Sequence, residues 1–354
     1  MAKLDFVGLA SMGDVVKRAR TSVRLTPNLF AIPFGLCGLA ECWSLAQALA
    51  FVPTWPADIL WVLAAGVWLG ILGAYLIDVV VGGRVRTELA DPTFSPFTAL
   101  VFIVPMFLGL AVAGHSRALG ESIFFVALAL TVLIGGWLSG TWIVADMTLA
   151  QWHPGYFLPT VAGGLIGAEG SAALGNDGLA RLMFGYGMTC WLVLGSIILL
   201  RLFTQPALPT ALIPTVSVEV APPVVAGAAW FQINGFQPDA LALGLAGYAV
   251  LMVLIQVRLI PVYRRVPFGP GWWAFSFSYA AAFAVAIRWL AVEQPPQQRG
   301  LTYALLTVVT AGMAALLLTT VRHLMRGTFF PRTGAASAAP PEPRSAPRVE
   351  AGQA

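Results

Sequence analysis

The stretch PNLFAIPFGLCGLAECWSLAQALA, residues 27–50, is followed closely by ADILWVLAAGVWLGILGAYLIDVV, residues 57–80, and this pair decides the fold. Each part is long enough to cross a bilayer, because a helical span needs about 20 apolar residues. The first part carries Pro33 in its interior, whereas the second contains no proline. The pair therefore predicts a membrane hairpin of one kinked and one straight helix.

The same alternation recurs along the chain. Further prolines interrupt later apolar segments at Pro105, Pro159 and the pair Pro222-Pro223, while the segments 120–144, 179–203 and 299–321 contain none. A proline inside a helix leaves a carbonyl unpaired and kinks the axis. In lipid such a break is tolerated only against protein or beside a water-filled cavity. We interpret the kinked helices as lining a pore and the straight helices as supporting them.

The composition places the chain in a membrane. It has 354 residues, of which 58% are hydrophobic and 10% charged, whereas soluble proteins carry roughly 25% charged residues. Ten spans are predicted, at 27–50, 57–80, 96–114, 120–144, 156–175, 179–203, 209–232, 237–261, 270–292 and 299–321. The kinked spans begin at intervals that pair all ten into five hairpins around a common axis.

Most Lys and Arg residues fall on one side of this topology. The positive-inside rule then places both termini in the cytoplasm, as in a multi-pass protein of a cell (inner) membrane. The net charge of +4 follows from that bias, so a nucleic-acid partner is not indicated. Three regions are predicted, a cytoplasmic N-terminal arm at 1–26, a membrane domain at 27–325 and a disordered cytoplasmic tail at 326–354, rich in Ala, Pro and Ser.

Ionisable residues inside spans are candidates for function, because a charge at mid-bilayer costs roughly 2.5–3.5 kcal/mol on insertion scales. Glu41 and Glu169 are interpreted as residues of the outer mouth or as salt-bridge partners. Arg288 either forms a structural pair with a nearby glutamate or attracts anions into an outer vestibule. Glu219 would repel a passing anion unless it is paired or protonated.

Small-residue spacings indicate close approach of helices. Three occur, at Gly66-x-x-x-Gly70, Gly136-x-x-x-Gly140 and Gly163-x-x-x-Gly167. We interpret them as ordinary packing inside one subunit in preference to a dimer motif.

No enzyme site is predicted. The three histidines pair with no carboxylate or cysteine cluster, and the three cysteines have no ligand-like spacing. No metalloprotease, nucleotide-binding or serine-hydrolase motif occurs in its proper context. Neither a metal nor a cofactor is expected.

The ninth span begins Gly271-Trp272-Trp273-Ala274-Phe275-Ser276-Phe277-Ser278-Tyr279. Its Trp-Trp-Ala-Phe-Ser-Phe run resembles the ninth helix of the tellurite-resistance/C4-dicarboxylate transporter family, which includes the slow-type anion channels of plant guard cells and the TehA-type bacterial proteins. The stretch TPNLFAIPFGL at 26–36 resembles the first helix of that family, and VAPPVVA at 220–226 resembles its seventh. The resemblance covers about residues 24–325.

This resemblance implies an all-α polytopic membrane protein with ten transmembrane helices, in five hairpins with quasi-fivefold symmetry around a central pore. It also implies a homotrimer with one pore per subunit, and a phenylalanine on the ninth helix that plugs the pore. Phe277 falls on that position, and Phe275 is the alternative if the register differs by two residues. The ninth span has no internal proline, and Ser276 and Ser278 are expected to loosen the helix instead.

The sequence thus predicts passive transport of small inorganic or organic anions through a pore gated by Phe277. The alternative is a proton-coupled transporter of dicarboxylates or related oxyanions, in the malate, sulfite or tellurite class, with Glu219 or Glu169 carrying the proton. A membrane scaffold without transport activity is a third possibility, but it gives no reason for the alternating prolines.

Overall fold

The computed structural model describes residues 25–330, and within this range the regular structure is entirely helical. Residues Leu25–Phe329 form one compact unit. The N-terminal arm expected at 1–26 and the tail expected at 326–354 lie mostly outside the described residues.

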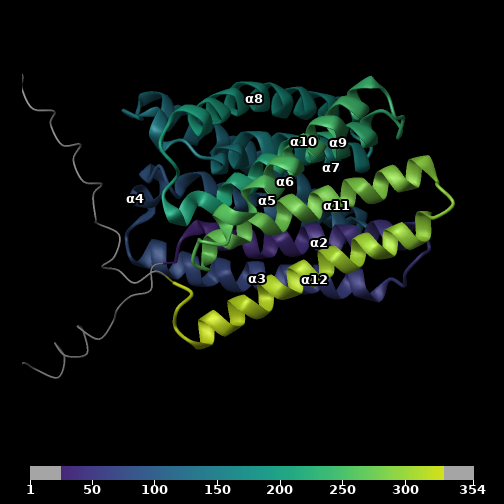
Figure 1. Cartoon of the computed structure of the whole chain (residues 1–354), viewed down its shortest axis with the longest axis horizontal. Coiled ribbons are helices and arrows are strands. Elements are labelled where there is room, and N and C mark those ends of the chain that lie inside the picture. Colours follow the sequence, from purple (N-terminus) through teal and green to yellow (C-terminus); the bar gives the residue numbers. More distant parts are fainter. Residues whose placement is uncertain (1–24, 331–354) are drawn as a thin grey trace, which may run out of the picture. The chain divides into compact units, whose positions relative to one another are not determined.

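Ten helical segments pair into five consecutive hairpins, as predicted (Figure 1). The first segments of the hairpins, the inner segments, are η1–α2 (Pro27–Phe30, Ala31–Ala48), η3–α5 (Ser95–Ala99, Leu100–Ala113), η5–η6–α7 (Pro154–Phe157, Leu158–Ala162, Gly163–Ala173), η7–α9 (Thr210–Val220, Ala221–Ile233) and η8–α11 (Pro270–Trp273, Ala274–Glu293). The second segments, the outer helices, are α3 (Trp55–Leu76, continued by η2, Ile77–Val81), α6 (Arg117–Val144), α8 (Asp177–Thr204), α10 (Ala240–Tyr263) and α12 (Gln298–Met325). Two short helices, α4 (Val85–Ala90) and η4 (Leu149–Gln151), lie between hairpins.

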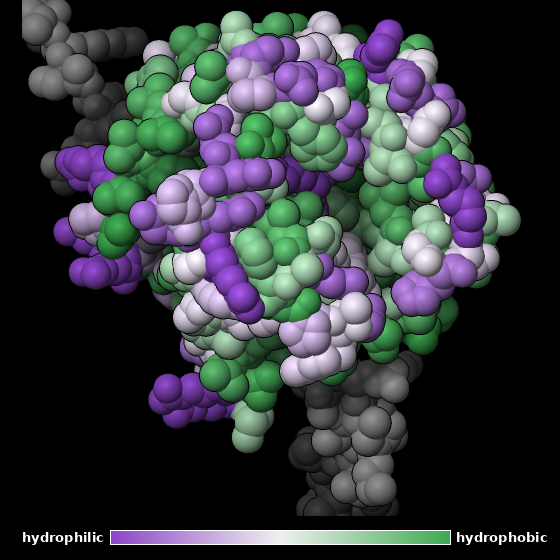
Figure 2. Space-filling model, turned by 90° about the vertical axis from the view of Figure 1, so that its right-hand side faces the viewer, coloured by the Kyte–Doolittle hydropathy of each residue, from purple (hydrophilic) through white to green (hydrophobic). Residues whose placement is uncertain are grey.

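The inner segments close into a ring. Helix α2 packs against α5, α5 against α7, α7 against α9, α9 against α11, and α11 returns to α2. The outer helices fill the grooves outside this ring: α3 contacts α2 and α5, α6 contacts α5 and α7, α8 contacts α7 and α9, and α12 contacts α11 and α2. The tight connections within the hairpins lie at one end, here called the hairpin-loop end. Figure 2 looks onto this end and shows polar and apolar side chains around a hollow near its middle. The opposite end, which holds Leu25 and Phe329, is the terminal end.

Burial separates the two sets of helices. In the inner segments that are long enough to span a membrane, 50–72% of the residues in an apolar stretch of 18 are buried. In the outer helices the corresponding share is 11–33%. Nine helices in the described range are long and apolar enough to span a membrane. The tenth predicted span, 156–175, corresponds to the composite run η5–η6–α7, in which no single helix reaches that length.

Every inner segment begins with a 3₁₀ stretch and continues as an α-helix, with a π turn between the two in the third hairpin. Prolines cluster at these transitions, because a residue without an N–H donor is tolerated best in a first helical turn. Pro222 and Pro223 lie in the first turn of α9, Pro33 lies in the first turn of α2, and Pro159 lies in the π turn, whereas Pro105 lies inside α5.

Glycines bring the helices of a hairpin into backbone contact. A Cβ atom at Gly120 of α6 would lie 2.3 Å from the backbone nitrogen of Ala113, and one at Gly164 of α7 would lie 2.7 Å from the Cα of Gly187. The predicted packing role holds for Gly163 and Gly167, whose added Cβ atoms would meet Thr131 and Leu128.

The same packing role is wrong for the glycine pairs on α3 and α6. No described atom lies within 4 Å of a Cβ built at Gly66, Gly70, Gly136 or Gly140. These four glycines lie on the outside of the helices, where residues 25–330 make no close contact with them.

Candidate functional site

A cavity lies inside the ring, at the level where the 3₁₀ stretches meet the α-helices. Its volume is about 40 Å³, room for about one water molecule, and all five inner segments contribute to it. Its lining is almost wholly apolar: Ala31, Phe34, Phe97, Leu100, Phe157, Leu158, Val161, Ala162, Leu165, Val218, Ala221, Pro222, Val225, Trp273, Ala274, Phe277 and Ser278. The inner ring therefore encloses a space along its axis.

Phe277 lies at the end of this cavity that faces the hairpin loops. Its ring stacks on Phe34 of α2, with centroids 3.6 Å apart and planes inclined by 14°. It also meets Phe107 of α5 edge to face at 5.6 Å, and Phe34 meets Phe107 at 6.0 Å. These three rings, the aromatic cluster, come from three inner helices, and the side chain of Phe277 is buried. Phe277 and Phe34 of this cluster belong to the lining of the cavity.

The neighbours of Phe277 on α11 point elsewhere. Phe275 meets Tyr263 of the outer helix α10 edge to face at 4.9 Å and stacks on Tyr279, so it lies outside the ring. The hydroxyl of Ser276 donates to the carbonyls of Trp273 and Ala31, and Ser276 packs against Gly35. Ser276 therefore lies at the interface between α11 and α2.

Among the prolines proposed as pore-lining or kink residues, Pro222 lines the cavity. Pro33 and Pro223 are buried, and each is adjacent in sequence to a lining residue, Phe34 and Pro222 respectively. Pro159 lies between the lining residues Leu158 and Val161, and Pro105 lies two residues before Phe107. The prolines thus mark the level of the cavity, although most of its wall consists of other side chains.

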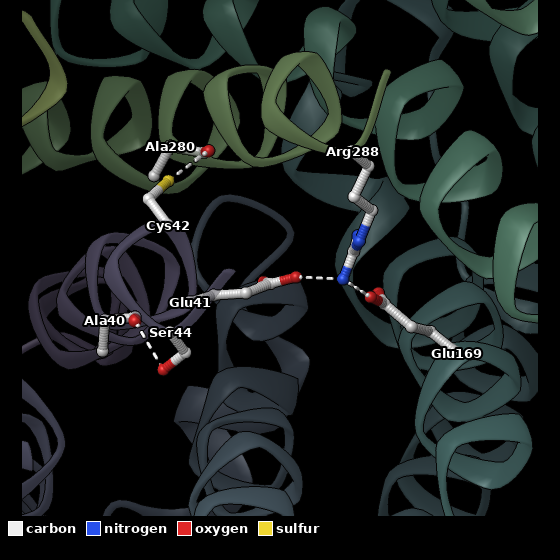
Figure 3. A network of polar contacts seen from close by, with 7 residues as sticks. All are labelled: Ala40, Glu41, Cys42, Ser44, Glu169, Ala280 and Arg288. Carbon is white, nitrogen blue, oxygen red and sulfur yellow. Dashed lines mark hydrogen bonds and ion pairs between the residues drawn. The ribbon is translucent and has the colours of Figure 1, made fainter. Parts of the chain in front are cut away.

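Arg288 lies farther along α11, toward the hairpin loops, and contacts two carboxylates (Figure 3). Its Nη2 donates to Oε1 of Glu41 on α2 at 2.6 Å and to Oε1 of Glu169 on α7 at 2.5 Å. The side chains of Arg288, Glu41 and Glu169 are exposed by only 6%, 15% and 10%. We call these three residues the charged triad.

Glu219 occupies a different environment. It follows the cavity-lining Val218 in η7, is 4% exposed, and its Oε1 has no hydrogen-bond partner among the described residues. Glu219 is therefore not part of the charged triad.

At the terminal end, His153 precedes the third inner segment and is completely buried. Its Nδ1 accepts a hydrogen bond from the amide of Gly155 at 3.2 Å, and its ring stacks on Phe97. Burial lowers the pKa of His153 to about 4, so its imidazole is neutral near pH 7. The described residues contain no group of three or more His, Cys, Asp or Glu side chains arranged to hold a metal ion.

Sequence reasoning missed Phe34 and Phe107, the two partners of Phe277. Both follow kink prolines, at Pro33 and Pro105. That proximity is a signal, because each of these two phenylalanines lies within two residues of a predicted kink. It could have selected these two from the 21 phenylalanines of the chain.

Comparisons with known proteins identify relatives of this chain. The family model described as voltage-dependent anion channel, SLAC1, matches residues 24–329. The chain is 27% identical over 308 residues to the tellurite resistance protein TehA homolog of Haemophilus influenzae, covering 86% of this chain and 93% of that protein.

Two plant proteins are also similar. The S-type anion channel SLAH3 of Arabidopsis thaliana is 27% identical over 85% of this chain and 48% of its own length. The guard cell S-type anion channel SLAC1 of the same plant is 26% identical over 87% of this chain and 58% of its own length. The chain thus spans about half the length of these plant relatives. On the strength of the family match over nearly the whole membrane domain, the chain belongs to the SLAC1 voltage-dependent anion channel family.

Proposed function

We propose that this protein lets small anions cross a membrane passively along the axis of the inner ring, through a path that Phe277 closes. The cavity carries this proposal, because all five inner segments line it and Phe277 and Phe34 of the aromatic cluster belong to its lining. The names of the relatives, anion channels among them, support an anion as the transported species.

The aromatic cluster suits a gate. A phenyl ring across a narrow apolar passage excludes hydrated ions by its bulk and by dewetting. Its contacts with Phe34 and Phe107 are each worth about 0.5–1.5 kcal/mol beyond the buried area. Moving the ring aside therefore needs a modest free energy, which a change of conformation can supply.

The test is anion flux into liposomes that contain the purified full-length protein. Phe277→Ala removes both aromatic contacts and the obstruction, so we expect the flux to rise at least about tenfold. Phe34→Ala should raise it less. Phe275→Ala is the matched control, because Phe275 faces α10 and should leave the flux unchanged. Equal flux for Phe277→Ala and Phe275→Ala, with equal protein in the bilayer, would contradict the gate.

A proton-coupled carrier of dicarboxylates or related oxyanions is the second candidate. The observation that favours it is Glu219, a buried carboxyl group with an unpaired oxygen next to a cavity-lining residue. Uptake driven by a pH gradient and abolished by Glu219→Gln would establish this candidate. Currents that reverse at the Nernst potential of the anion would exclude it.

We further propose a homotrimer with no enzymatic activity, located in a cell inner membrane with its terminal end in the cytoplasm. Arg84, which pairs with Asp78, and the exposed Arg264 and Arg265 follow outer helices at the terminal end, consistent with this orientation. Native mass spectrometry can count the 37.5 kDa chains per particle, and a monomer would contradict the trimer.

A further inference from the structure

The charged triad crosses the interior of the inner ring. Arg288 belongs to α11, which packs against α2 and α9, whereas Glu169 belongs to α7, which packs against α5 and α9. Because α11 and α7 are not neighbours around the ring, the contact between Arg288 and Glu169 passes across its middle. Figure 3 shows the guanidinium extended between the two carboxylates.

The triad lies beyond the aromatic cluster, on the same face of α11. Arg288 is eleven residues after Phe277 in an unbroken α-helix, which corresponds to about 16 Å. Between them on this face lie Ala280, Ala281, Ala284 and Val285, all buried and none polar. An anion that passes the displaced ring of Phe277 therefore meets the guanidinium of Arg288 next.

Arg288 has hydrogen-bonding capacity that the protein does not use. Both carboxylates accept from the same nitrogen, Nη2. Nε and Nη1 are buried and have no acceptor among the described residues. Buried donors of a cation are costly when unpaired, and a guanidinium binds a planar pair of oxygens best through two parallel N–H groups. A residue that served only as a tie between helices would have its donors satisfied by the groups it ties.

We propose that Arg288 is the anion-contacting residue on the hairpin-loop side of Phe277, and that Glu41 and Glu169 occupy its guanidinium at rest. The carboxylates show what the site accepts, since a planar oxyanion with two acceptor oxygens can replace one of them and engage the free N–H groups. Arg288 thereby gives the path a preference for such oxyanions over spherical halides. This inference rests on the proposed function.

The test compares formate with chloride in liposomes that contain the full-length protein, with every variant built on Phe277→Ala so that the aromatic closure is removed. Arg288→Lys keeps the positive charge but loses the planar fork, so the ratio of formate to chloride flux should fall about tenfold. Arg181→Lys, on the exposed face of α8, is the matched control and should leave the ratio unchanged.

Two further variants keep the inference testable if Arg288→Lys fails to fold. Glu41→Gln and Glu169→Gln each remove one competing charge while keeping the shape of the side chain. Each should raise the flux of both anions and preserve the preference for formate. An unchanged or lower flux in both of them, or an unchanged ratio in folded Arg288→Lys, would overturn the inference.

A binding measurement separates this inference from the proposed function. If Phe277→Ala conducts neither anion, the proposed function fails. The thermal stability of the wild-type protein in formate and in chloride then tests whether Arg288 binds an anion. Greater stabilisation by formate that disappears in Arg288→Lys would support the anion site. Equal stabilisation by the two salts would overturn it.

Discussion

The inner segments and the outer helices are built from similar apolar residues, yet they differ in nearly every structural property. The inner α-helices have 11–20 residues, follow 3₁₀ stretches and are largely buried. The outer helices have 22–28 residues, start directly as α-helices and leave large apolar side chains such as Trp137 and Leu133 exposed. The outer helices have the surface of protein in contact with lipid, whereas the inner segments have the interior of a packed domain.

This difference shows which segments carry the features that are unfavourable in lipid. Broken helices and ion pairs are expensive in lipid. The cavity, the aromatic cluster and the charged triad therefore all lie on the inner segments, and the outer helices shield them. Changes at inner positions should accordingly cost much more than matched changes at outer positions.

The largest effect on stability is expected for tryptophan. Trp273 is 1% exposed and donates to Thr320 of α12 at 3.0 Å, so Trp273→Ala should lower the free energy of unfolding by roughly 3–5 kcal/mol. Trp137 on α6 is 66% exposed, and Trp137→Ala should change it by less than about 0.5 kcal/mol. Denaturation of the purified protein measures both values. Similar losses for the two variants would break the distinction between inner and outer positions.

The second-largest effect is the pH dependence of the free energy of unfolding. The pKa of His153 is lowered to about 4 by burial, whereas an unfolded histidine has a pKa of about 6.5. Protonation therefore favours the unfolded state, and the stability present above pH 6.5 is lost as the pH falls toward 4. The loss should reach roughly 3 kcal/mol.

His153→Gln should remove that part of the pH dependence, while His115→Gln, at an exposed position between α5 and α6, should retain it. Unfolding curves at pH 7, 5.5 and 4.5 provide the measurement. An equal pH dependence in the wild-type protein and His153→Gln would show that the imidazole is not held neutral.

The smallest effect on stability is expected when glycines are replaced by alanine. A Cβ at Gly35 of α2 would lie 2.1 Å from the Oγ of Ser276, so Gly35→Ala should destabilise the protein by roughly 1–3 kcal/mol. At Gly66 of α3 no described atom lies within 4 Å, and Gly66→Ala should stabilise the helix by up to about 1 kcal/mol. Melting temperatures in detergent compare the two. A destabilising Gly66→Ala would reveal a contact that α3 makes outside the described chain.

The sequence predicted the hairpins and their inner members, because helix length, apolar runs and proline positions are local properties. Pro33, Pro105, Pro159 and Pro222 marked the inner segments correctly. The register of Phe277 came from family resemblance, since no local property distinguishes Phe277 from Phe275.

Other features depend on how the ring closes. Phe34 and Phe107 meet Phe277 only because α2, α5 and α11 converge. The sequence allows a pair between Arg288 and a glutamate, but its two partners and its course across the ring depend on the order of the helices. At Gly66 and Gly136 the sequence predicts a contact that is not found among the described residues, because this motif, typical of helix packing, lies on an unpacked face.

A cysteine placed just beyond the aromatic cluster tests the proposed anion path most directly. Ala284, which lies on α11 between Phe277 and Arg288, is replaced by cysteine after Cys37, Cys42 and Cys190 have been removed. An anionic, membrane-impermeant thiol reagent is then added from the terminal end.

We expect no reaction at Ala284→Cys while Phe277 is present, and a rapid reaction once Phe277→Ala is added. Unchanged reactivity at position 284 in the two backgrounds would contradict the claim that the inner ring encloses an anion path closed by Phe277.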